Sequence, residues 1–527
     1  MEVQSFRSLA HSAQTVVIAA LIFVACYYLP KLNFKAQLAK LPAFAEGGEK
    51  QRNEFLKHGK SMYLQGYEKF KNQVFRMTGS DGAETVVISP LFLSELRKLP
   101  DSVVSFPKAV EDVSVKKATN RSNRADAVQL MEVKYTGLLA DEPLGVHAVR
   151  ADLTPALARL NPMVYSEVLQ ALEEVMPTCE DWTAVNIYGK LVSMVAMITG
   201  RVLVGPDLCR DKEFQRLSIE YTMQLITAQL EIKKIRPLFK PWSAPRLDSV
   251  KKLHTSRKDL ANFLEPIIQA RRDAEKSDPD GQRPDDMVAW LMNRNGEFGI
   301  KSTHHLAQIV LGLIFASIHT TTLTATNILY TLAVQTEYIE PIREEIRQVM
   351  TDNGGTISTR ALQQMMKLDS YMKESMRFYP PGFTSFQRKV TRGFTLSNGQ
   401  YIPAGVNIEV ASHAVYQDPA NYSKPGPADV FDGFRAYKLR QGGTATDHAR
   451  NQFVTTNEHN LMFGYGKHAC PGRFFAANEI KMILANLILR YDFKNEDGSK
   501  ERYAQLDMGR QSSPDARKSL LFKAVTV

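Results

Sequence analysis

The distribution of apolar residues along the chain is mostly that of amphipathic helices. Through several long stretches, apolar side chains recur at every third or fourth position, which is the spacing of one helix face. Residues 85–88, a short apolar run of Thr, Val, Val and Ile, are typical of a strand, and Asn398-Gly399 indicates a β-hairpin. The chain is therefore expected to be mainly α-helical with small β-sheets. The main helical stretches are residues 164–175, 184–204, 214–235, 249–272 and 304–334.

The amino-terminal region contains an uncharged apolar segment at residues 15–29. Counting back through neighbouring apolar residues brings it close to the ~20 residues of a membrane-spanning helix. A cleaved secretory signal is the alternative, but the end of the segment offers no small-residue cleavage site. Lysines at positions 31, 35 and 40 follow the segment and only Arg7 precedes it, so the rest of the chain is expected in the cytosol. We expect an uncleaved anchor over residues 1–30 and a linker over residues 31–50.

Charge and cysteine content narrow the class of protein. The 527 residues carry a formal net charge of +10, but no basic, aromatic-interleaved module or nucleic-acid motif accompanies it, so no nucleic-acid partner is expected. A basic face toward anionic lipid and an acidic protein partner explains the charge better. The four cysteines (26, 179, 209 and 470) are widely separated, which favours a reducing compartment over a disulfide framework.

Residues 463–473 carry the most specific chemical signal. Gly464 and Gly466 permit a tight turn, and Pro471 suits the first turn of a following helix. Cys470 is thereby placed at the positive end of a helix, where a thiolate is favoured. Such a thiolate is a nucleophile, a metal ligand or a redox thiol, and no second cysteine lies nearby for a redox pair or a zinc site. A buried structural cysteine is the alternative.

This stretch resembles the haem-binding signature FxxGxxxCxG of the cytochrome P450 family. Phe463, Gly466, Cys470 and Gly472 match that pattern in order and spacing. The resemblance implies a mainly helical haem-thiolate fold with haem b as the cofactor. It also implies that the thiolate of Cys470 is the axial ligand of the haem iron.

The resemblance further implies cationic contacts to the haem propionates. The family usually has arginine two residues before the cysteine, and His468 occupies that position here. Arg388 is a second expected contact. Arg150 or His147 is expected to make a third contact. The alternative is that these residues are solvated charges on a helix surface, because the tryptophan that is usual in this region of the family is absent.

The helical stretch that begins near His304 carries the sequence Ala316-Ser-Ile-His-Thr-Thr. It resembles the family motif (A/G)Gx(D/E)T, which lies on the oxygen side of the haem. By this resemblance, Thr320 is expected to bond the bound oxygen and assist proton delivery. His319 replaces the usual acid, and its unperturbed pKa suits a proton relay near neutral pH. A structural histidine is the alternative.

Glu374 and Arg377 lie three residues apart in a predicted helix, a spacing that brings both side chains to one face. By spacing alone they form an ordinary surface ion pair. Beside the cysteine signature they resemble the ExxR motif of the family, which is buried behind the haem. Arg435 is then the expected third member, and the three residues are expected to hold the haem pocket rather than to do chemistry.

Together these resemblances imply a monooxygenase that uses O2 and electrons from NADPH, supplied by a separate NADPH-cytochrome P450 reductase. No GxGxxG element follows a predicted strand, so a fused nucleotide-binding module is not expected. The expected substrate is a lipophilic small molecule, a terpenoid or indole-terpenoid of fungal secondary metabolism. The alternatives are a haem-thiolate isomerase or dehydratase that needs no external electrons, and a non-catalytic haem-binding protein.

The same interpretation assigns residues 51–527 to one catalytic domain on the cytosolic side of the endoplasmic reticulum membrane. Between two helical stretches, residues 235–242 contain prolines and the apolar residues Leu238, Phe239 and Trp242. This connection is either a second membrane contact or part of the core.

Overall fold

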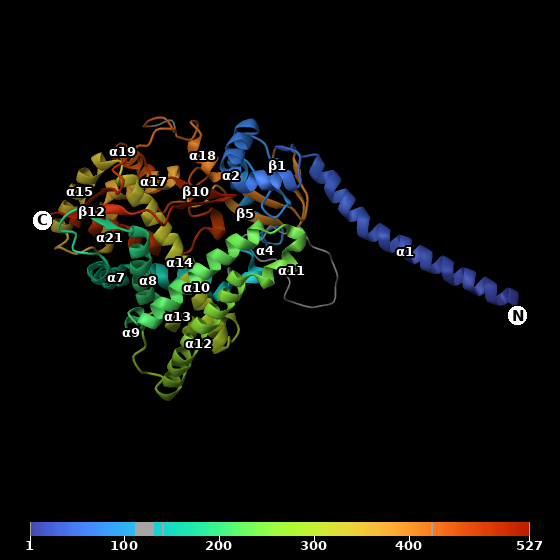
Figure 1. The fold of residues 1–527 in the computed structure, drawn as a ribbon, viewed down its shortest axis with the longest axis horizontal. Helices are drawn as coiled ribbons and strands as arrows, with labels where there is room; N and C mark the ends of the chain where they lie inside the picture. The colour runs from blue at the N-terminus through green and yellow to red at the C-terminus, as the bar shows by residue number, and fades with distance from the viewer. Residues whose placement is uncertain (1, 111–130, 140–141, 423–424, 526–527) are drawn as a thin grey trace.

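The computed structural model describes residues 2–110, 131–139, 142–422 and 425–525. Figure 1 shows a helical body from which one long helix, α1 (Glu2–Ala39), projects. The other helices are α2 (Glu49–Lys69), α3 (Leu93–Leu96), α4 (Pro107–Val110), α5 (Val133–Thr136), α6 (Pro143–Ala148), α7 (Thr154–Val175), α8 (Ile187–Leu203), α9 (Pro206–Cys209), α10 (Lys212–Lys234), α11 (Lys240–Ser243), α12 (Asp248–Ser277), α13 (Met287–Asn293), α14 (Thr303–Leu332), α15 (Ile339–Asp352), α16 (Thr359–Gln364), α17 (Met366–Phe378), α18 (Ser412–Gln417), α19 (Arg435–Gln441), α20 (Ala445–Arg450) and α21 (Arg473–Arg490).

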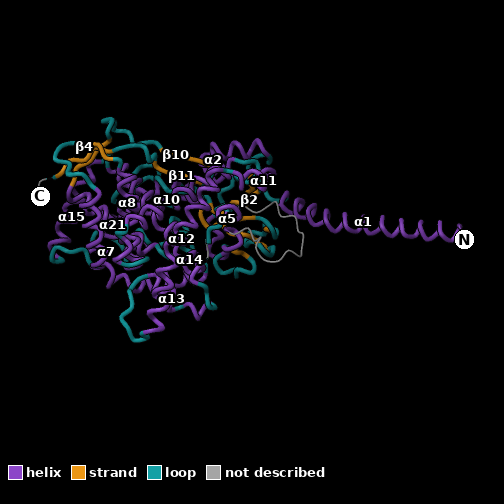
Figure 2. The backbone as a smooth tube through the Cα atoms, turned by 60° about the horizontal axis from the view of Figure 1, so that its bottom comes forward, coloured by secondary structure: helices purple, strands orange, loops and turns teal. Residues whose placement is uncertain are grey.

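The two larger sheets lie at opposite ends of the body, and the two-stranded sheet β10–β11 lies between them (Figure 2). A five-stranded sheet has the order β1-β2-β8-β5-β3, in which β2 and β8 are parallel and the other pairs are antiparallel. A three-stranded antiparallel sheet, β4-β12-β9, lies near the carboxyl terminus. The strands are β1 (Phe75–Thr78), β2 (Glu84–Val87), β3 (Val104–Ser105), β4 (Thr183–Val185), β5 (Ser385–Val390), β6 (Phe394–Thr395), β7 (Tyr401–Ile402), β8 (Asn407–Val410), β9 (Tyr491–Asn495), β10 (Gln505–Met508), β11 (Gln511–Pro514) and β12 (Leu520–Ala524).

The predicted elements are largely confirmed. The hairpin β6–β7 turns at Gly399, whose φ of 84° favours glycine. The helix predicted over residues 184–204 begins three residues later, because Asn186 caps α8 by accepting a hydrogen bond from the Gly189 N–H at 2.8 Å. The residues just before this cap form β4 instead.

Helix α14 is the centre of the helical body. Ser302 caps its start, since the Ser302 hydroxyl accepts a hydrogen bond from the His305 N–H at 3.1 Å. The helix is apolar enough to cross a membrane by composition, but most of it is buried within the protein. Its neighbours are α8, α10, α12, α17 and α21, so α14 is a core helix.

Helix α1 continues nine residues beyond the predicted anchor boundary at residue 30. The most apolar 18-residue window within its segment Val17–Ala39 has a mean hydropathy of 1.7, and none of that window is buried. Leu38, at the end of the helix, and Leu41 are buried against the five-stranded sheet and its neighbours. This packing gives the last turns of α1 a tertiary partner, so residues 31–39 are helical and the predicted linker is reduced to residues 40–48.

Candidate functional site

The loop before Cys470 is closed by backbone hydrogen bonds. The Cys470 N–H donates to the Phe463 carbonyl at 2.7 Å, and the Ala469 N–H donates to the Gly466 carbonyl at 3.0 Å. Gly464 and Gly466 have φ values of 77° and 71°, which side chains rarely permit. The Phe463 ring packs edge-on against Phe453. The glycines and the phenylalanine of the signature therefore fix the position of the cysteine.

Cys470 is half-buried and lies three residues before the start of α21. Burial raises the pKa of its thiol, although the backbone N–H groups of Gly472 and Arg473 and the charge of Arg473 act in the opposite direction. The helix terminus alone therefore does not yield a thiolate, contrary to the expectation from sequence. A metal ion bonded to the sulfur would supply that stabilisation, since coordinated thiols are deprotonated.

The predicted propionate contacts fall into two groups. His468 and Arg388 both border the Phe106 ring, with the His468 ring centroid at 5.2 Å and the Arg388 guanidinium at 5.1 Å. Arg388 is also buried against Phe386, while the His468 Nε2 lies 3.0 Å from Asp101.

Arg150 belongs to a second, more exposed cationic group. It lies on a π-helical turn, η2 (Val149–Leu153), and donates to the Lys467 carbonyl at 2.6 Å. Arg97, Lys467 and Arg473 line the same cavity of about 420 Å³. Arg97 and Arg473 were not identified from the sequence, because neither stands out in a local motif. His147 instead packs against Phe298.

Thr320 and His319 lie on different sides of α14. Ala316 and Thr320 are exposed one turn apart, although most of the helix is buried, and the Thr320 hydroxyl donates to the Ala316 carbonyl at 2.7 Å. His319 is only 2% exposed. Its Nε2 lies 2.9 Å from the Thr222 hydroxyl on α10, and its Nδ1 lies 3.3 Å from the Tyr188 hydroxyl on α8.

The surroundings of His319 favour the structural alternative over a proton relay. Burial lowers the pKa of His319 to about 4, so the ring is neutral at cytosolic pH. Both ring nitrogens have partners on neighbouring helices, and neither faces the side on which Thr320 is exposed.

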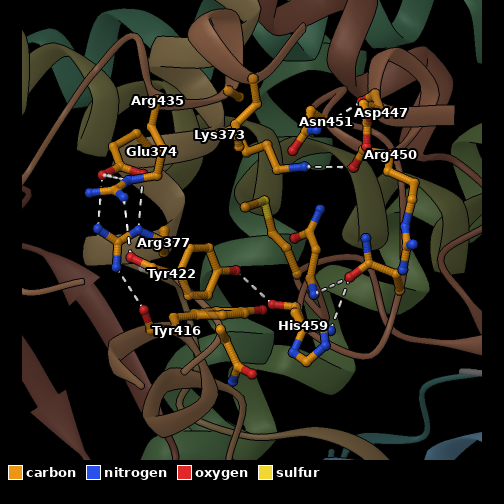
Figure 3. Close-up of a pocket in the computed structure, with 16 residues that line it drawn as sticks. Lys373, Glu374, Arg377, Tyr416, Tyr422, Arg435, Asp447, Arg450, Asn451 and His459 are labelled. Carbon is orange, nitrogen blue, oxygen red and sulfur yellow. Dashed lines mark hydrogen bonds and ion pairs between the residues drawn. The ribbon is translucent and has the colours of Figure 1, made fainter. Parts of the chain in front are cut away.

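Glu374, Arg377 and Arg435 form a buried lock (Figure 3). Each of the three is 3% exposed. The Glu374 carboxylate accepts two hydrogen bonds from Arg377, at 2.8 and 2.9 Å, and one from Arg435 at 3.2 Å. This burial excludes the surface ion pair that the spacing alone allows.

The lock is connected to the cysteine loop. Arg377 donates to the Tyr416 carbonyl at 2.6 Å, and the Tyr416 hydroxyl accepts a hydrogen bond from the Leu461 N–H at 3.1 Å. Leu461 lies two residues before Phe463. The guanidinium groups also bond carbonyl groups of residues 426–430, so the lock joins α17, α19 and the segment that leads to Cys470.

The connection between α10 and α12 has an apolar outer side. Leu238 and Trp242 are 72% and 59% exposed, and Phe239 is also exposed. On the inner side, Lys240 forms a buried ion pair with Glu132 at 2.6 Å, and Arg52 bonds the carbonyl groups at the end of α10. The three apolar residues are therefore not core. α11 lies at the end of the body from which α1 departs (Figures 1 and 2).

These features define a haem-thiolate class of protein: a cysteine fixed in a glycine-bearing loop, a buried Glu–Arg–Arg lock and a long helix with an exposed threonine. A family model described as Cytochrome P450 matches residues 87–516. The chain belongs to the cytochrome P450 family, as the signature predicts, and its relatives are monooxygenases. The cofactor of this family is haem with a cysteine thiolate bound to the iron.

The similar curated proteins are fungal. The chain is 34% identical to cytochrome P450 monooxygenase TES1 of Alternaria alternata, over 98% of this chain and 96% of that protein. It is 34% identical to cytochrome P450 monooxygenase paxP of Penicillium paxilli (96% and 94%) and 33% identical to ent-kaurene oxidase P450-4 of Gibberella fujikuroi (89% and 88%). The retinoic-acid-bound cyanobacterial CYP120A1 has the same fold, with a TM-score of 0.63 and 18% identity over 92% of this chain and 99% of that one.

Proposed function

We propose that this protein is a membrane-anchored monooxygenase that oxidises a terpenoid or indole-terpenoid, with Cys470 as the axial ligand of haem b. When bound, haem activates O2 for insertion into a C–H bond. The observation that carries the proposal is the closed loop around Cys470, with the backbone N–H groups of Gly472 and Arg473 directed at the sulfur of this half-buried residue. His468 and Arg388 would hold the propionates beside Phe106.

Thr320 is the residue we assign to the oxygen side. Its hydroxyl is exposed on α14 and is both a donor and an acceptor. By turning its hydrogen away from the Ala316 carbonyl, it would orient the oxygen and pass a proton to it. His319 does not share this exposed face, and both of its ring nitrogens have partners on other helices, so we assign proton delivery to Thr320 alone.

Electrons would come from NADPH through a separate reductase. Arg97, Arg150, Lys467 and Arg473 make the surface beside the cysteine loop cationic, which fits an acidic electron-transfer protein. Helix α1 and the apolar side of the α10–α12 connection would both contact the endoplasmic reticulum membrane, because they lie at one end of the body.

The terpenoid assignment rests on the relatives rather than on pocket geometry. One relative is named an oxidase of ent-kaurene, which is a diterpene. The test is to incubate the haem-loaded protein and a fungal reductase with NADPH and a panel of diterpenes and indole-diterpenes. Oxygenated product that requires both reductase and NADPH supports the proposal. Rearranged product formed without NADPH would establish the isomerase alternative.

A further inference from the structure

His319 forms a hydrogen-bond bridge between three helices. Its Nε2 meets Thr222 of α10 at 2.9 Å and its Nδ1 meets Tyr188 of α8 at 3.3 Å. Thr222 is fully buried and His319 nearly so. The two partners lie 97 and 131 residues away from His319 in the chain, so the bridge joins elements that are distant in sequence.

The direction of each bond follows from the number of hydrogens. The single hydroxyl hydrogen of Thr222 faces the Ser218 and Ile219 carbonyls of its own helix, at 3.0 and 2.9 Å. Thr222 therefore accepts from His319, which requires a hydrogen on Nε2. The unprotonated Nδ1 then accepts from the Tyr188 hydroxyl. A neutral imidazole satisfies both contacts, in agreement with the pKa of His319, which burial lowers to about 4.

The section of α14 around His319 has little intrinsic helical stability. Hydroxyl side chains at positions 317, 320, 322, 324 and 326 each donate to the carbonyl four residues earlier, at 2.7–2.8 Å. Such bonds slightly destabilise and often bend a helix, and threonine is a weak helix former. The position of this section must therefore be set by contacts with its neighbours.

The bridge supplies such a contact next to the residue assigned to the oxygen side, because His319 directly precedes Thr320. Helix α10 continues for about three turns beyond Thr222 to the connection that carries Leu238 and Trp242. Arg52 fixes the end of α10 through the Lys233 and Ile235 carbonyls. A displacement of this connection therefore reaches α14 through one continuous helix, whose inner face is buried.

We infer that Thr222 and Tyr188 are positioning residues that act through His319 to hold Thr320 in place and couple the α10–α12 connection to the oxygen side of α14. This inference rests on the proposed function only in assigning Thr320 to the oxygen side. The bridge is not a path for protons, because the imidazole acts as a fixed donor and acceptor.

The test uses the full-length, haem-loaded protein and the variants Thr222→Val, Thr222→Ser, Tyr188→Phe and His319→Gln. Valine has nearly the shape of threonine without the hydroxyl, and serine keeps the hydroxyl. Two readouts need no substrate. The first is amide hydrogen exchange of α14, and the second is the infrared band of carbon monoxide bound to the reduced protein, which senses polar groups on the oxygen side.

Thr222→Val is expected to speed exchange at residues 316–322 by about tenfold, which corresponds to about 1.4 kcal/mol, because the buried Nε2–H of His319 would lose its acceptor. It should also shift or broaden the carbon monoxide band. Tyr188→Phe should have a smaller effect through its longer contact. Thr222→Ser and His319→Gln, which keep the hydrogen bonds, should resemble the wild type.

An unchanged band and unchanged exchange in Thr222→Val would overturn the inference. The inference would also be overturned if His319→Gln showed faster exchange and a shifted band while Thr222→Val behaved like the wild type. The imidazole itself, and not its hydrogen bond to Thr222, would then be required. Failure of the wild-type protein to give any thiolate-type carbon monoxide complex would instead refute the proposed function.

Discussion

Replacing Glu374 by glutamine tests the buried lock. The substitution keeps the shape of the side chain but removes the negative charge that Arg377 and Arg435 share. It also places an amide nitrogen, a donor, beside guanidinium donors. Both guanidinium groups remain about 97% buried, since each arginine is 3% exposed, and they have no other carboxylate partner among the described residues.

The expected loss of stability follows from this burial. Breaking one buried ion pair costs about 3–5 kcal/mol, and Glu374 has two partners, so we expect a loss on the order of 5 kcal/mol. Folded proteins have a total stability of only about 5–15 kcal/mol. The Cys470 loop should be affected as well, because Arg377 holds Tyr416 and Tyr416 holds Leu461.

The assay is urea denaturation of the full-length protein followed by circular dichroism, together with the haem-to-protein ratio after purification. Glu213→Gln is the matched control, because Glu213 and Arg216 have the same spacing and a 2.8 Å contact but are exposed. We expect Glu374→Gln to lose haem and unfold at much lower urea, whereas Glu213→Gln should behave as the wild type. Similar midpoints and haem contents in both variants would refute the reasoning.

Three further predictions follow from individual side chains. Thr320→Ala should keep haem but release more hydrogen peroxide per NADPH consumed. Thr324→Ala is the control, because the wild-type Thr324 is largely buried, and it should not raise the peroxide yield. Equal peroxide yields in the two variants would remove Thr320 from the oxygen side. Burial raises the pKa of Glu479 to about 8, so the folded state keeps a proton that the unfolded state releases above its own pKa of about 4.3. The stability of the wild-type protein should therefore fall as pH rises between these two values, by up to about 1.4 kcal/mol per pH unit. Glu479→Gln should flatten this pH dependence. A wild-type urea midpoint that does not fall between pH 5 and 8 would contradict this. Truncation before Lys31 should leave part of the protein on membranes, and adding Trp242→Ser should release it; complete release by truncation alone would show that the α10–α12 connection makes no membrane contact.

The features that the sequence predicts well are those encoded locally. The cysteine loop depends on two glycines within eight residues, and the pair Glu374–Arg377 depends on helical spacing, so both are readable as patterns. Arg435 was identified only through resemblance, because a contact between residues 61 positions apart has no local signal.

Contacts set by tertiary packing were not predictable. The bridge from His319 to Thr222 and Tyr188 depends on how α14 packs between two other helices, so the sequence left both a relay and a structural role open. The pKa of Cys470 was expected to fall at a helix terminus, but burial, which no motif encodes, has the larger effect. The extension of α1 to Ala39 likewise depends on the burial of Leu38.

The central claim is that Cys470 provides the thiolate that binds haem iron, and the spectrum of the reduced carbon monoxide complex tests it most directly. The wild-type protein should show the thiolate-type Soret band, and Cys470→Ser should lack it. Cys209→Ser, which removes a buried thiol that bonds the Pro206 carbonyl, should keep the band. A thiolate-type band that survives in Cys470→Ser would contradict the account.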